Sequence, residues 1–509
     1  MPDTARYAGL ILHPSSLPGP YGIGDFGPAA DTWIDWLART HQTLWQVLPL
    51  GPTGYGDSPY QLLSAFAGNP LLISPERLVE GGLLTRGDLE PLPAAAPTRI
   101  DFPEVIAYKR RLLRTACDRL AAAGASSWRA KVESYKESER RWLDDFGLFM
   151  VLKARHDGRP WNEWPADLAQ RDPRALAQAR SHLASEIEAV TFEQMLFHDQ
   201  WQHVRARARQ LGIRIIGDLP LYLAFDSAEV WANPGLFRLD VHGMPTHVAG
   251  VPPDYFSPTG QRWGNPLYRW AAHRTDGFAW WKRRLEGALH LSDWVRIDHF
   301  RGLAAYWEVP ANSPTAETGR WVRAPGAALL SALASRLQPL PLIAEDLGVM
   351  TKDVADLRTR FGLPGMRVLQ FAFDGDSRNP FLPHNFDPHT VVYTGTHDND
   401  TTRGWYAQAD EGVRDFARRY MGRDGADLAW DVIRLAWSSV AFMALAPLQD
   451  VLDLGSEARM NFPGRASGNW GWRFTEGDLT PGRAERLGEL TLLTARTGRE
   501  AARDLPTPY

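Results

Sequence analysis

The sequence predicts an α/β fold: a (β/α)₈ barrel of parallel strands, enlarged by inserted segments. Eight short apolar runs rich in β-branched residues recur along the 509 residues, and most of them are followed by a stretch with helical patterning. Strands that alternate with helices favour a parallel barrel over a β-sandwich. The polar or turn residues that end the runs mark the edge at which the active sites of such barrels lie.

Each predicted strand is a mostly apolar run that stops at a polar residue or a turn. In chain order, the runs are Leu10–His13, Leu44–Leu50, Ile213–Leu219, Trp294–His299, Leu340–Asp346, Arg367–Phe373, Val391–His397 and Val440–Leu448. The helical patterns between them supply the crossovers that parallel strands require. About 60 residues follow the eighth run, so we expect no large C-terminal β-domain.

The uneven spacing of the runs predicts two insertions into a single catalytic unit, residues 1–509. About 160 residues separate the second run from the third, and they include charged helical segments at Tyr108–Leu120, Trp128–Ala154 and Pro173–Glu188. We expect a helical subdomain there, at about residues 75–190. A second subdomain is expected at residues 231–290, which contain the turn-rich segment GVPPDYFSPTGQRWGNPLY.

Composition restricts the classes of function. Lys and Arg number 56 against 60 Asp and Glu, so the chain lacks the basic excess that favours nucleic acid or an anionic membrane. Cys117 is the only cysteine, which excludes an intramolecular disulfide and a Cys-based zinc site. The N-terminus has no signal-peptide pattern, and no apolar stretch reaches the ~20 residues of a membrane helix. We expect a cytoplasmic protein that binds neither nucleic acid nor membrane.

Three segments resemble cofactor or metal motifs, but their details disagree with those functions. Gly22–Gly27 matches G-x-G-x-x-G, yet a long connector precedes it and Asp25 would lie beside the pyrophosphate. In Gly51–Ser58, Asp57 stands where a phosphate loop needs a lysine. The HDND segment at residues 397–400 lacks the ligand spacing of known helical zinc or calcium sites. We therefore expect neither a cofactor nor a metal.

Four carboxylates stand at the carboxyl ends of predicted strands: Asp218, Asp298, Glu345 and Asp398. The strand ends of a parallel barrel converge, so these residues can share one pocket. A single carboxylate in such a position more often caps the next helix. Four together, with Arg296 two residues before Asp298 and on the same face of its strand, indicate an active site instead.

A cluster of carboxylates suits the chemistry of glycosidic bonds. Like charges in close proximity separate in pKa, and retaining glycosidases use this: one carboxylate attacks the anomeric carbon while a protonated partner donates to the leaving oxygen. Arg296 would hold Asp298 ionised. His299 and His397 could donate hydrogen bonds to sugar hydroxyls, although each alone is more often structural. The 21 Trp, 14 Tyr and 21 Phe supply a large aromatic core, and also faces for sugar rings.

Ten segments of the chain carry a resemblance to a known family. They are HPSSLPGPYGIGDFG, WQVLPLGPTGYGDSPYQ, SAFAGNPLLI, IIGDLPLYLAFDSAEVW, GVPPDYFSPTGQRWGNPLYRW, VRIDHFRG, IAEDLGV, FGLPGMRVLQFAF, YTGTHDNDTT and SEARMNFPGR. From about residue 8 to 473 they are similar, in this order, to the 4-α-glucanotransferases (amylomaltases, or disproportionating enzymes) of glycoside hydrolase family 77. The resemblance implies an α-1,4-glucan substrate such as maltodextrin or amylose.

The resemblance also implies a role for each strand-end residue. Asp298 matches the nucleophile, Glu345 the general acid/base, and Asp398 the carboxylate that grips the hydroxyls of the distorted sugar. The subsite for the reacting glucose is implied to contain Tyr60, Asp218, Arg296, His397 and Asn469.

Two further features follow from the resemblance. The family has a loop over the cleft, which corresponds here to residues 250–264, with Tyr255, Phe256 and Trp263 available to stack on glucose rings. Tyr55 matches a tyrosine of a remote second glucan site in bacterial members. Phe102 stands where that site has a second tyrosine.

The sequence thus predicts a 4-α-glucanotransferase. It would move α-1,4-glucan segments from a maltodextrin donor to the 4-hydroxyl of an acceptor by double displacement through a covalent glucosyl-enzyme. Two alternatives remain: an α-glucan hydrolase and a catalytically inactive glucan-binding protein. The complete set of carboxylates argues against the inactive protein, and the products formed from maltotriose distinguish the two enzymes.

Overall fold

Eight parallel strands close into a barrel in the computed structural model, which describes residues 5–90, 92, 97–121, 126–253, 257–348, 350–465 and 467–498. Each strand pairs with the next one in the chain, and the last pairs with the first. The predicted (β/α)₈ barrel is confirmed. Its strands are β1 (Tyr7–Ile11), β2 (Leu44–Gln46), β3 (Arg214–Leu219), β6 (Trp294–Ile297), β9 (Leu342–Ala344), β10 (Gly365–Val368), β11 (Thr390–Tyr393) and β12 (Met443–Pro447).

Every strand overlaps a predicted run, but the prediction for β10 is wrong in its second half. The chain turns into a 3₁₀ helix at Leu369–Phe371 instead of staying extended to Phe373. The strand also begins early, at Gly365, where a Cβ would lie 2.4 Å from the Asp346 carboxylate. That carboxylate accepts a 2.7 Å hydrogen bond from the backbone N–H of Met366, so glycine allows the close approach that joins β9 to β10.

Side chains along each strand point alternately into and out of the barrel, and the inward-facing ones form first its apolar interior and then its polar site. Inward-facing residues of β3, β9, β10 and β11, such as Ile216, Ile343, Met366 and Val391, form one buried apolar cluster. Two residues after Ile216 the same face carries Asp218, and two after Ile343 it carries Glu345. The apolar interior therefore ends in a polar layer at the carboxyl end of the barrel, which we call the mouth.

Helices surround the barrel. They are α1 (Pro28–Arg39), α7 (Ala184–Gln210), α10 (Ala279–Leu291), α11 (Gly326–Ala334), α12 (Lys352–Arg360), α13 (Thr402–Gln408), α14 (Glu411–Met421), α15 (Leu428–Ser438), α16 (Leu448–Val451) and α17 (Pro481–Leu493). Their buried faces are rich in indoles: Trp33 and Trp36 of α1 and Trp201 of α7 pack near Trp45 of β2. These aromatic contacts fix the helices on the outside of the sheet.

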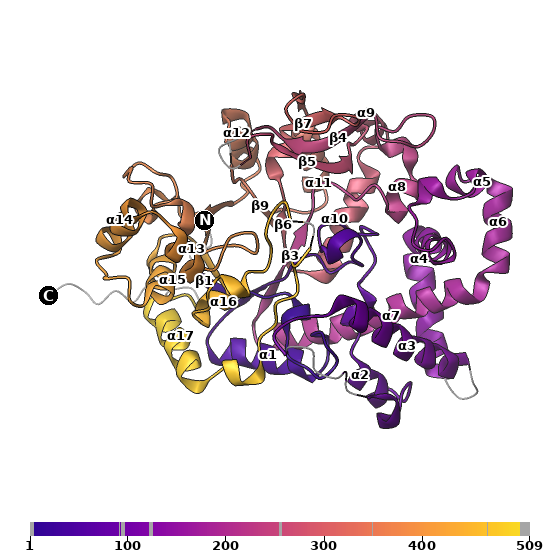
Figure 1. Ribbon diagram of the computed structural model, residues 1–509, viewed down its shortest axis with the longest axis horizontal. Coiled ribbons are helices and arrows are strands. Elements are labelled where there is room, and N and C mark those ends of the chain that lie inside the picture. The colour runs from indigo at the N-terminus through magenta and orange to yellow at the C-terminus, as the bar shows by residue number, and fades with distance from the viewer. Residues whose placement is uncertain are drawn as a thin grey trace.

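The connection between β2 and β3 is helical. It contains α2 (Pro75–Glu80), α3 (Phe102–Ala121), α4 (Ser126–Arg155), α5 (Ala166–Ala169) and α6 (Pro173–His182), followed by α7. Figure 1 shows α4, α5 and α6 at one end of the long axis and α14 at the other.

A buried ion pair ties this connection to the Gly22–Gly27 segment. Lys109 of α3 donates from Nζ to Asp25 at 2.9 Å and to the carbonyl oxygen of Ile73 at 2.7 Å. Asp25 also accepts from the backbone N–H of Gly27. The glycine-rich segment is therefore a structural turn held by Lys109, in agreement with its poor match to a nucleotide-binding motif.

A four-stranded antiparallel sheet lies over β3, β6 and β9 in the view of Figure 1. Its order is β5-β4-β7-β8, from β4 (His247–Val251), β5 (Gln261–Pro266), β7 (Ala305–Pro310) and β8 (Arg320–Arg323). Helix α8 (Ala228–Ala232) precedes β4 in the chain, and α9 (Trp270–Thr275) follows β5. Two of its strands follow β6, outside the predicted subdomain at residues 231–290. No helix in the described part of the chain is long and apolar enough to cross a bilayer.

Candidate active site

Two carboxylates and an arginine occupy neighbouring strand ends at the mouth of the barrel, joined by a third carboxylate one strand further. Asp218 is the fifth residue of β3, and Asp298 and Glu345 directly follow β6 and β9. These three strands pair in that order. Arg296 lies opposite Asp218 in the register of β3 and β6, two residues before Asp298. The geometry therefore brings together four residues that are far apart in the sequence.

Arg296 binds two of these carboxylates at once. Its Nη1 donates to Oδ2 of Asp218 at 2.6 Å, and its Nη2 donates to Oδ1 of Asp298 at 2.9 Å. The hydroxyl of Tyr60 donates to the same Asp218 oxygen at 2.6 Å. Burial acts to lower the pKa of Arg296, which is 3% exposed, but the two carboxylates raise it well above its ordinary value. Arg296 is thus a permanent positive charge beside Asp298.

Glu345 is held by the backbone rather than by a cation. Its Oε2 accepts from the N–H of His299 at 2.7 Å, and its Oε1 accepts from the N–H of Leu347 at 3.1 Å. His299 has φ 53°, in the left-handed region that non-glycine residues seldom adopt. Such backbone strain is often found at functional sites, and here it accompanies the bond between His299 and Glu345.

The two carboxylates Asp298 and Glu345 have different pKa values. Burial raises the pKa of Asp298 to about 6, and Arg296 opposes the rise. Burial raises the pKa of Glu345 to about 8; Arg296 again opposes the rise, and the charge of Asp298 adds to it. Asp298 loses its proton first because Arg296 bonds it directly. Between these pKa values the site holds an ionised carboxylate and a protonated carboxylic acid.

Asp398 lies on the loop after β11 and is braced by residues 459–461. Asn461 donates from Nδ2 to Oδ1 of Asp398 at 2.6 Å, and Arg459 donates to its backbone oxygen at 2.6 Å. His397 Nε2 lies 3.3 Å from Oδ2. Burial acts to raise the pKa of Asp398, but His397 and Asn461 hold it well below its ordinary range. Asp398 is therefore an ionised hydrogen-bond acceptor.

Flat rings line two sides of these carboxylates. Tyr60 stacks on His397, with ring centroids 5.0 Å apart, and Trp470 lies 5.8 Å from Tyr60 and 5.9 Å from His397. On another side, Trp263 of β5 meets the ring of His299 edge to face at 4.8 Å. Aromatic faces beside polar groups are the surfaces that bind sugar rings.

The HDND segment at residues 397–400 makes protein contacts rather than a metal cluster. Asp400 accepts hydrogen bonds from Ser456 at 2.6 Å and Gln408 at 2.9 Å, while Asn399 accepts from the hydroxyl of Thr396. Within the described ranges, no group of three or more His, Cys, Asp or Glu side chains is arranged to hold a metal ion.

A comparison with family models matches residues 12–480 to glycoside hydrolase family 77, described as 4-alpha-glucanotransferase. The chain belongs to this family. The 4-alpha-glucanotransferase of Thermus thermophilus is 52% identical over 502 residues, which cover 97% of this chain and 100% of that protein. That of Synechocystis sp. is 47% identical, covering 96% of this chain and 98% of the relative.

Solved structures agree with this membership. The amylomaltase from Streptococcus agalactiae in complex with acarbose has a TM-score of 0.94 and 36% identity, covering 96% of this chain and 99% of that one. The amylomaltase from Corynebacterium glutamicum has a TM-score of 0.76 at 19% identity, covering 97% of this chain and 75% of that one, and supports the fold alone. The family, the barrel and the 4-alpha-glucanotransferase activity predicted from the sequence are confirmed.

Among the expected residues of the 4-alpha-glucanotransferase site, Asn469 forms hydrogen bonds within its own loop. Asn469, expected in the glucose subsite, accepts from the N–H of Phe462 and donates to the carbonyl oxygen of Arg465. It closes its own loop, while Asn461 makes the bond to Asp398. Asn461 and Trp470 were not predicted as site residues from the sequence, although Asn469 of the same loop was. Nothing in the residue types separates Asn461 from Asn469, since the loop has no regular periodicity.

The other expected residues fall into three groups. Tyr60, Asp218, Arg296, His299, His397 and Trp263 lie with the carboxylates in the contacts described above. Tyr55 lies on the surface with 77% of its area exposed, apart from these contacts. Tyr255 and Phe256, expected on the cleft loop at residues 250–264, lie outside the described residues.

Proposed function

We propose that this 4-alpha-glucanotransferase breaks an α-1,4 bond of a maltodextrin and transfers the donor segment to the 4-hydroxyl of another sugar, with retention at the anomeric carbon. The observation that supports the mechanism is the difference in protonation state between two carboxylates. Asp298 accepts a hydrogen bond from Arg296 and is ionised, whereas Glu345 accepts hydrogen bonds from backbone N–H groups and is protonated. Retaining enzymes use such a pair about 5–5.5 Å apart, and we expect that separation here.

In the first step, Asp298 attacks the anomeric carbon and Glu345 protonates the leaving oxygen. The bond between Asp298 Oδ and the anomeric carbon forms as the glycosidic bond breaks. The proton of Glu345 goes to the oxygen of the departing glucan, which leaves with a free 4-hydroxyl. The negative charge of Asp298 is consumed, and Arg296 keeps its second carboxylate partner, Asp218. The proposed products are a glucosyl ester on Asp298 and an ionised Glu345.

The second step reverses the roles. Ionised Glu345 removes the proton from the 4-hydroxyl of an acceptor, whose oxygen attacks the anomeric carbon and displaces Asp298. Asp398, ionised and braced by Asn461, would accept hydrogen bonds from the hydroxyls of the reacting glucose in both steps. Tyr60 and His397 would form the ring wall of the same subsite.

Transfer requires that a sugar reach the ester before water does. A site that covers the cleft and binds the acceptor raises its effective molarity at the ester. Trp263, whose ring contacts that of His299, the residue that bonds Glu345 through its backbone, would stack an acceptor glucose on the leaving-group side. We propose that residues 250–264 carry this function.

Further support comes from the relatives. The Streptococcus agalactiae amylomaltase is described in complex with acarbose, and its fold covers nearly all of this chain. We infer that the mouth of the barrel binds maltodextrin, amylose or another α-1,4-glucan. Residues 1–509 would act as one catalytic unit with insertions at about 75–190 and 231–290, and a cytoplasmic location stays a prediction of the sequence.

Incubation with maltotriose tests the proposal. Disproportionation gives glucose and longer maltodextrins while the number of reducing ends stays almost constant. Chromatography of the products together with a reducing-end assay measures both. A rise in reducing ends in step with the bonds broken would favour the hydrolase, and the absence of any turnover would favour the inactive glucan-binding protein.

A further inference from the structure

His13 lies at the mouth of the barrel, two residues after β1, and no step of the proposed reaction uses it. It is 7% exposed and begins a buried turn. Its backbone oxygen accepts from the N–H of Ser16 at 2.9 Å, and the Ser16 hydroxyl donates to the carbonyl oxygen of Trp472 at 2.8 Å. The backbone that carries the imidazole is therefore fixed by hydrogen bonds within a buried turn.

No hydrogen bond to the His13 ring comes from any residue that the structure describes, and its Nδ1 is buried. A buried polar atom without a partner costs about 1–3 kcal/mol, so it is retained where it serves a purpose. His299, on the other side of the carboxylates, shows the same feature at Nε2. Two histidines, each with one buried ring nitrogen that has no hydrogen-bond partner, thus lie at one mouth.

The chemistry of the His13 ring suits a sugar. Burial lowers its pKa to about 3, and His397 adds to the effect, so the ring is neutral at working pH. A neutral imidazole has one N–H donor and one acceptor nitrogen, and a sugar hydroxyl both donates and accepts. A charged histidine would instead oppose Arg296 and the transition state, in which positive charge develops on the sugar.

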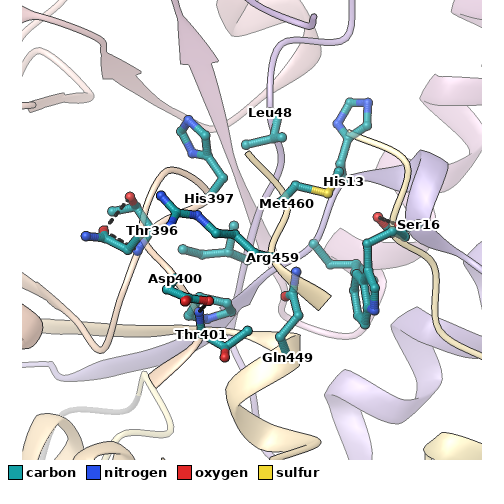
Figure 2. Close-up of a pocket in the computed structure, with 15 residues that line it drawn as sticks. His13, Ser16, Leu48, Thr396, His397, Asp400, Thr401, Gln449, Arg459 and Met460 are labelled. Carbon is teal, nitrogen blue, oxygen red and sulfur yellow. Dashed lines mark hydrogen bonds between the residues drawn. The ribbon is translucent and has the colours of Figure 1, made fainter. Parts of the chain in front are cut away.

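The cavity beneath His13 connects it to the Asp398 loop. It has a volume of about 30 Å³, room for about one water molecule, and its lining includes His13, His397, Asp400 and Arg459. In Figure 2 the rings of His397 and His13 lie at the upper left and upper right of this pocket, with Leu48 and Met460 between them. Nδ1 is the buried ring nitrogen, whereas Nε2 is not among the buried unpartnered atoms of the described residues, so Nε2 is the ring atom open to a ligand.

We propose that Nε2 of His13 hydrogen-bonds a hydroxyl of the glucose whose anomeric carbon reacts, on the side of the subsite formed by His397 and Asp398. This assignment rests on the proposed function. His13 would be a substrate-positioning residue: it holds the ring so that the anomeric carbon faces Asp298, and it takes no part in proton transfer.

Three substitutions at this position separate the two ring nitrogens. The amide nitrogen of His13→Gln reaches the place of Nε2, that of His13→Asn reaches the place of Nδ1, and His13→Ala has neither. His242→Ala, at an exposed histidine far along the chain, is the matched control. The donors are α-glucosyl fluoride, which fills only the reacting subsite, and maltotriose.

We expect His13→Ala and His13→Asn to lower kcat/KM about 5- to 30-fold for both donors, the loss of one hydrogen bond in the transition state. His13→Gln should stay within about threefold of the parent, and His242→Ala should match it. The pH profile should not change among the variants, because the ring is neutral throughout; Tm, measured in parallel, shows that each variant is folded at the assay temperature.

Three outcomes would overturn the assignment: His13→Ala within twofold of the parent, equal recovery by the Gln and Asn variants, or a loss confined to maltotriose. The third would place the contact outside the reacting subsite. Failure of the proposed transferase function shows separately, as hydrolysis or inactivity of the unmodified protein. Consumption of the fluoride still reports on His13 if the unmodified protein hydrolyses.

Discussion

The backbone N–H of His299 donates a hydrogen bond to Oε2 of Glu345 at 2.7 Å. His299 directly follows Asp298, so one bond ties the proposed nucleophile's segment to the proposed acid/base. Asp298 is itself bonded to Arg296, two residues earlier on β6. The position of the Glu345 carboxylate relative to the segment of Asp298 is therefore set by main-chain geometry at the ends of β6 and β9, while Arg296 orients the Asp298 carboxylate.

Asp298→Asn should lower turnover of maltotriose by about three orders of magnitude or more, because an amide oxygen is a poor nucleophile for the anomeric carbon. Maltodextrin binding, measured by calorimetry, should stay largely intact. Asp374→Asn, at an exposed loop residue, is the control. Residual activity within about tenfold of the parent, or roughly 1.4 kcal/mol of barrier, would reject Asp298 as nucleophile once deamidated material is excluded.

The pH dependence of kcat/KM should be bell-shaped. Asp298 must be ionised, so the rate falls as pH drops below about 6; Glu345 must be protonated, so the rate falls as pH rises above about 8. The charge of Asp218 contributes to the raised pKa of Asp298. Asp218→Asn should therefore move the acid limb to lower pH, whatever its effect on the maximum rate. A shift to higher pH would contradict the arrangement around Arg296.

Lys109→Met should destabilise the fold by about 3–5 kcal/mol, since it leaves the buried carboxylate of Asp25 without its cation. Chemical denaturation measures the change in free energy of unfolding. Lys131→Met is a matched control: the Lys131–Asp199 pair is about half-exposed and should contribute less than about 1 kcal/mol. Equal effects of the two substitutions would show that Lys109 does not hold the Gly22–Gly27 turn.

Trp263→Ala should raise the ratio of hydrolysis to transfer several-fold on maltotriose, because the acceptor loses its stacking surface while water does not. Trp263→Phe keeps an aromatic face and should recover most of the transfer. The ratio comes from reducing ends formed per glycosidic bond broken. If transfer and hydrolysis fall by the same factor, Trp263 supports the fold of the site and does not select the acceptor.

Residue patterns were enough to find the barrel and its carboxylates, for a physical reason. Period-two alternation and the convergence of parallel strands together place Asp218, Asp298 and Glu345 at one edge, whatever their distance in the chain. The same alternation places Arg296, two residues before Asp298, on the inner face of its strand. The pairing of β3 with β6 and of β6 with β9 then follows from the order of the barrel strands in the chain.

Features that depend on long-range packing were not predictable in this way. The partner of Asp398 is Asn461 and not Asn469, because the fold of an aperiodic loop decides which amide reaches the carboxylate. The start of β10 depends on the contact between Asp346 and Gly365. The strands β7 and β8 join β4 and β5 across the intervening β6, a pairing that no local pattern specifies.

Glu345→Gln prepares the decisive experiment. The variant cannot protonate a glucan 4-oxygen, so cleavage of maltotriose should fall by about 10²- to 10⁴-fold. Fluoride leaves without an acid, so attack by Asp298 on an α-glycosyl fluoride should persist. Without its general base, the variant should also be slow to release the ester.

Peptide mass mapping of Glu345→Gln after brief incubation with α-glucosyl fluoride, at neutral pH and without acceptor, measures the central claim most directly. The account predicts one covalent glucosyl group, on the peptide that contains Asp298, which is lost only slowly when glucose or maltose is added as acceptor, because the variant has no general base. A label on another carboxylate, or fluoride release with no covalent label and a β-anomeric product, would contradict it.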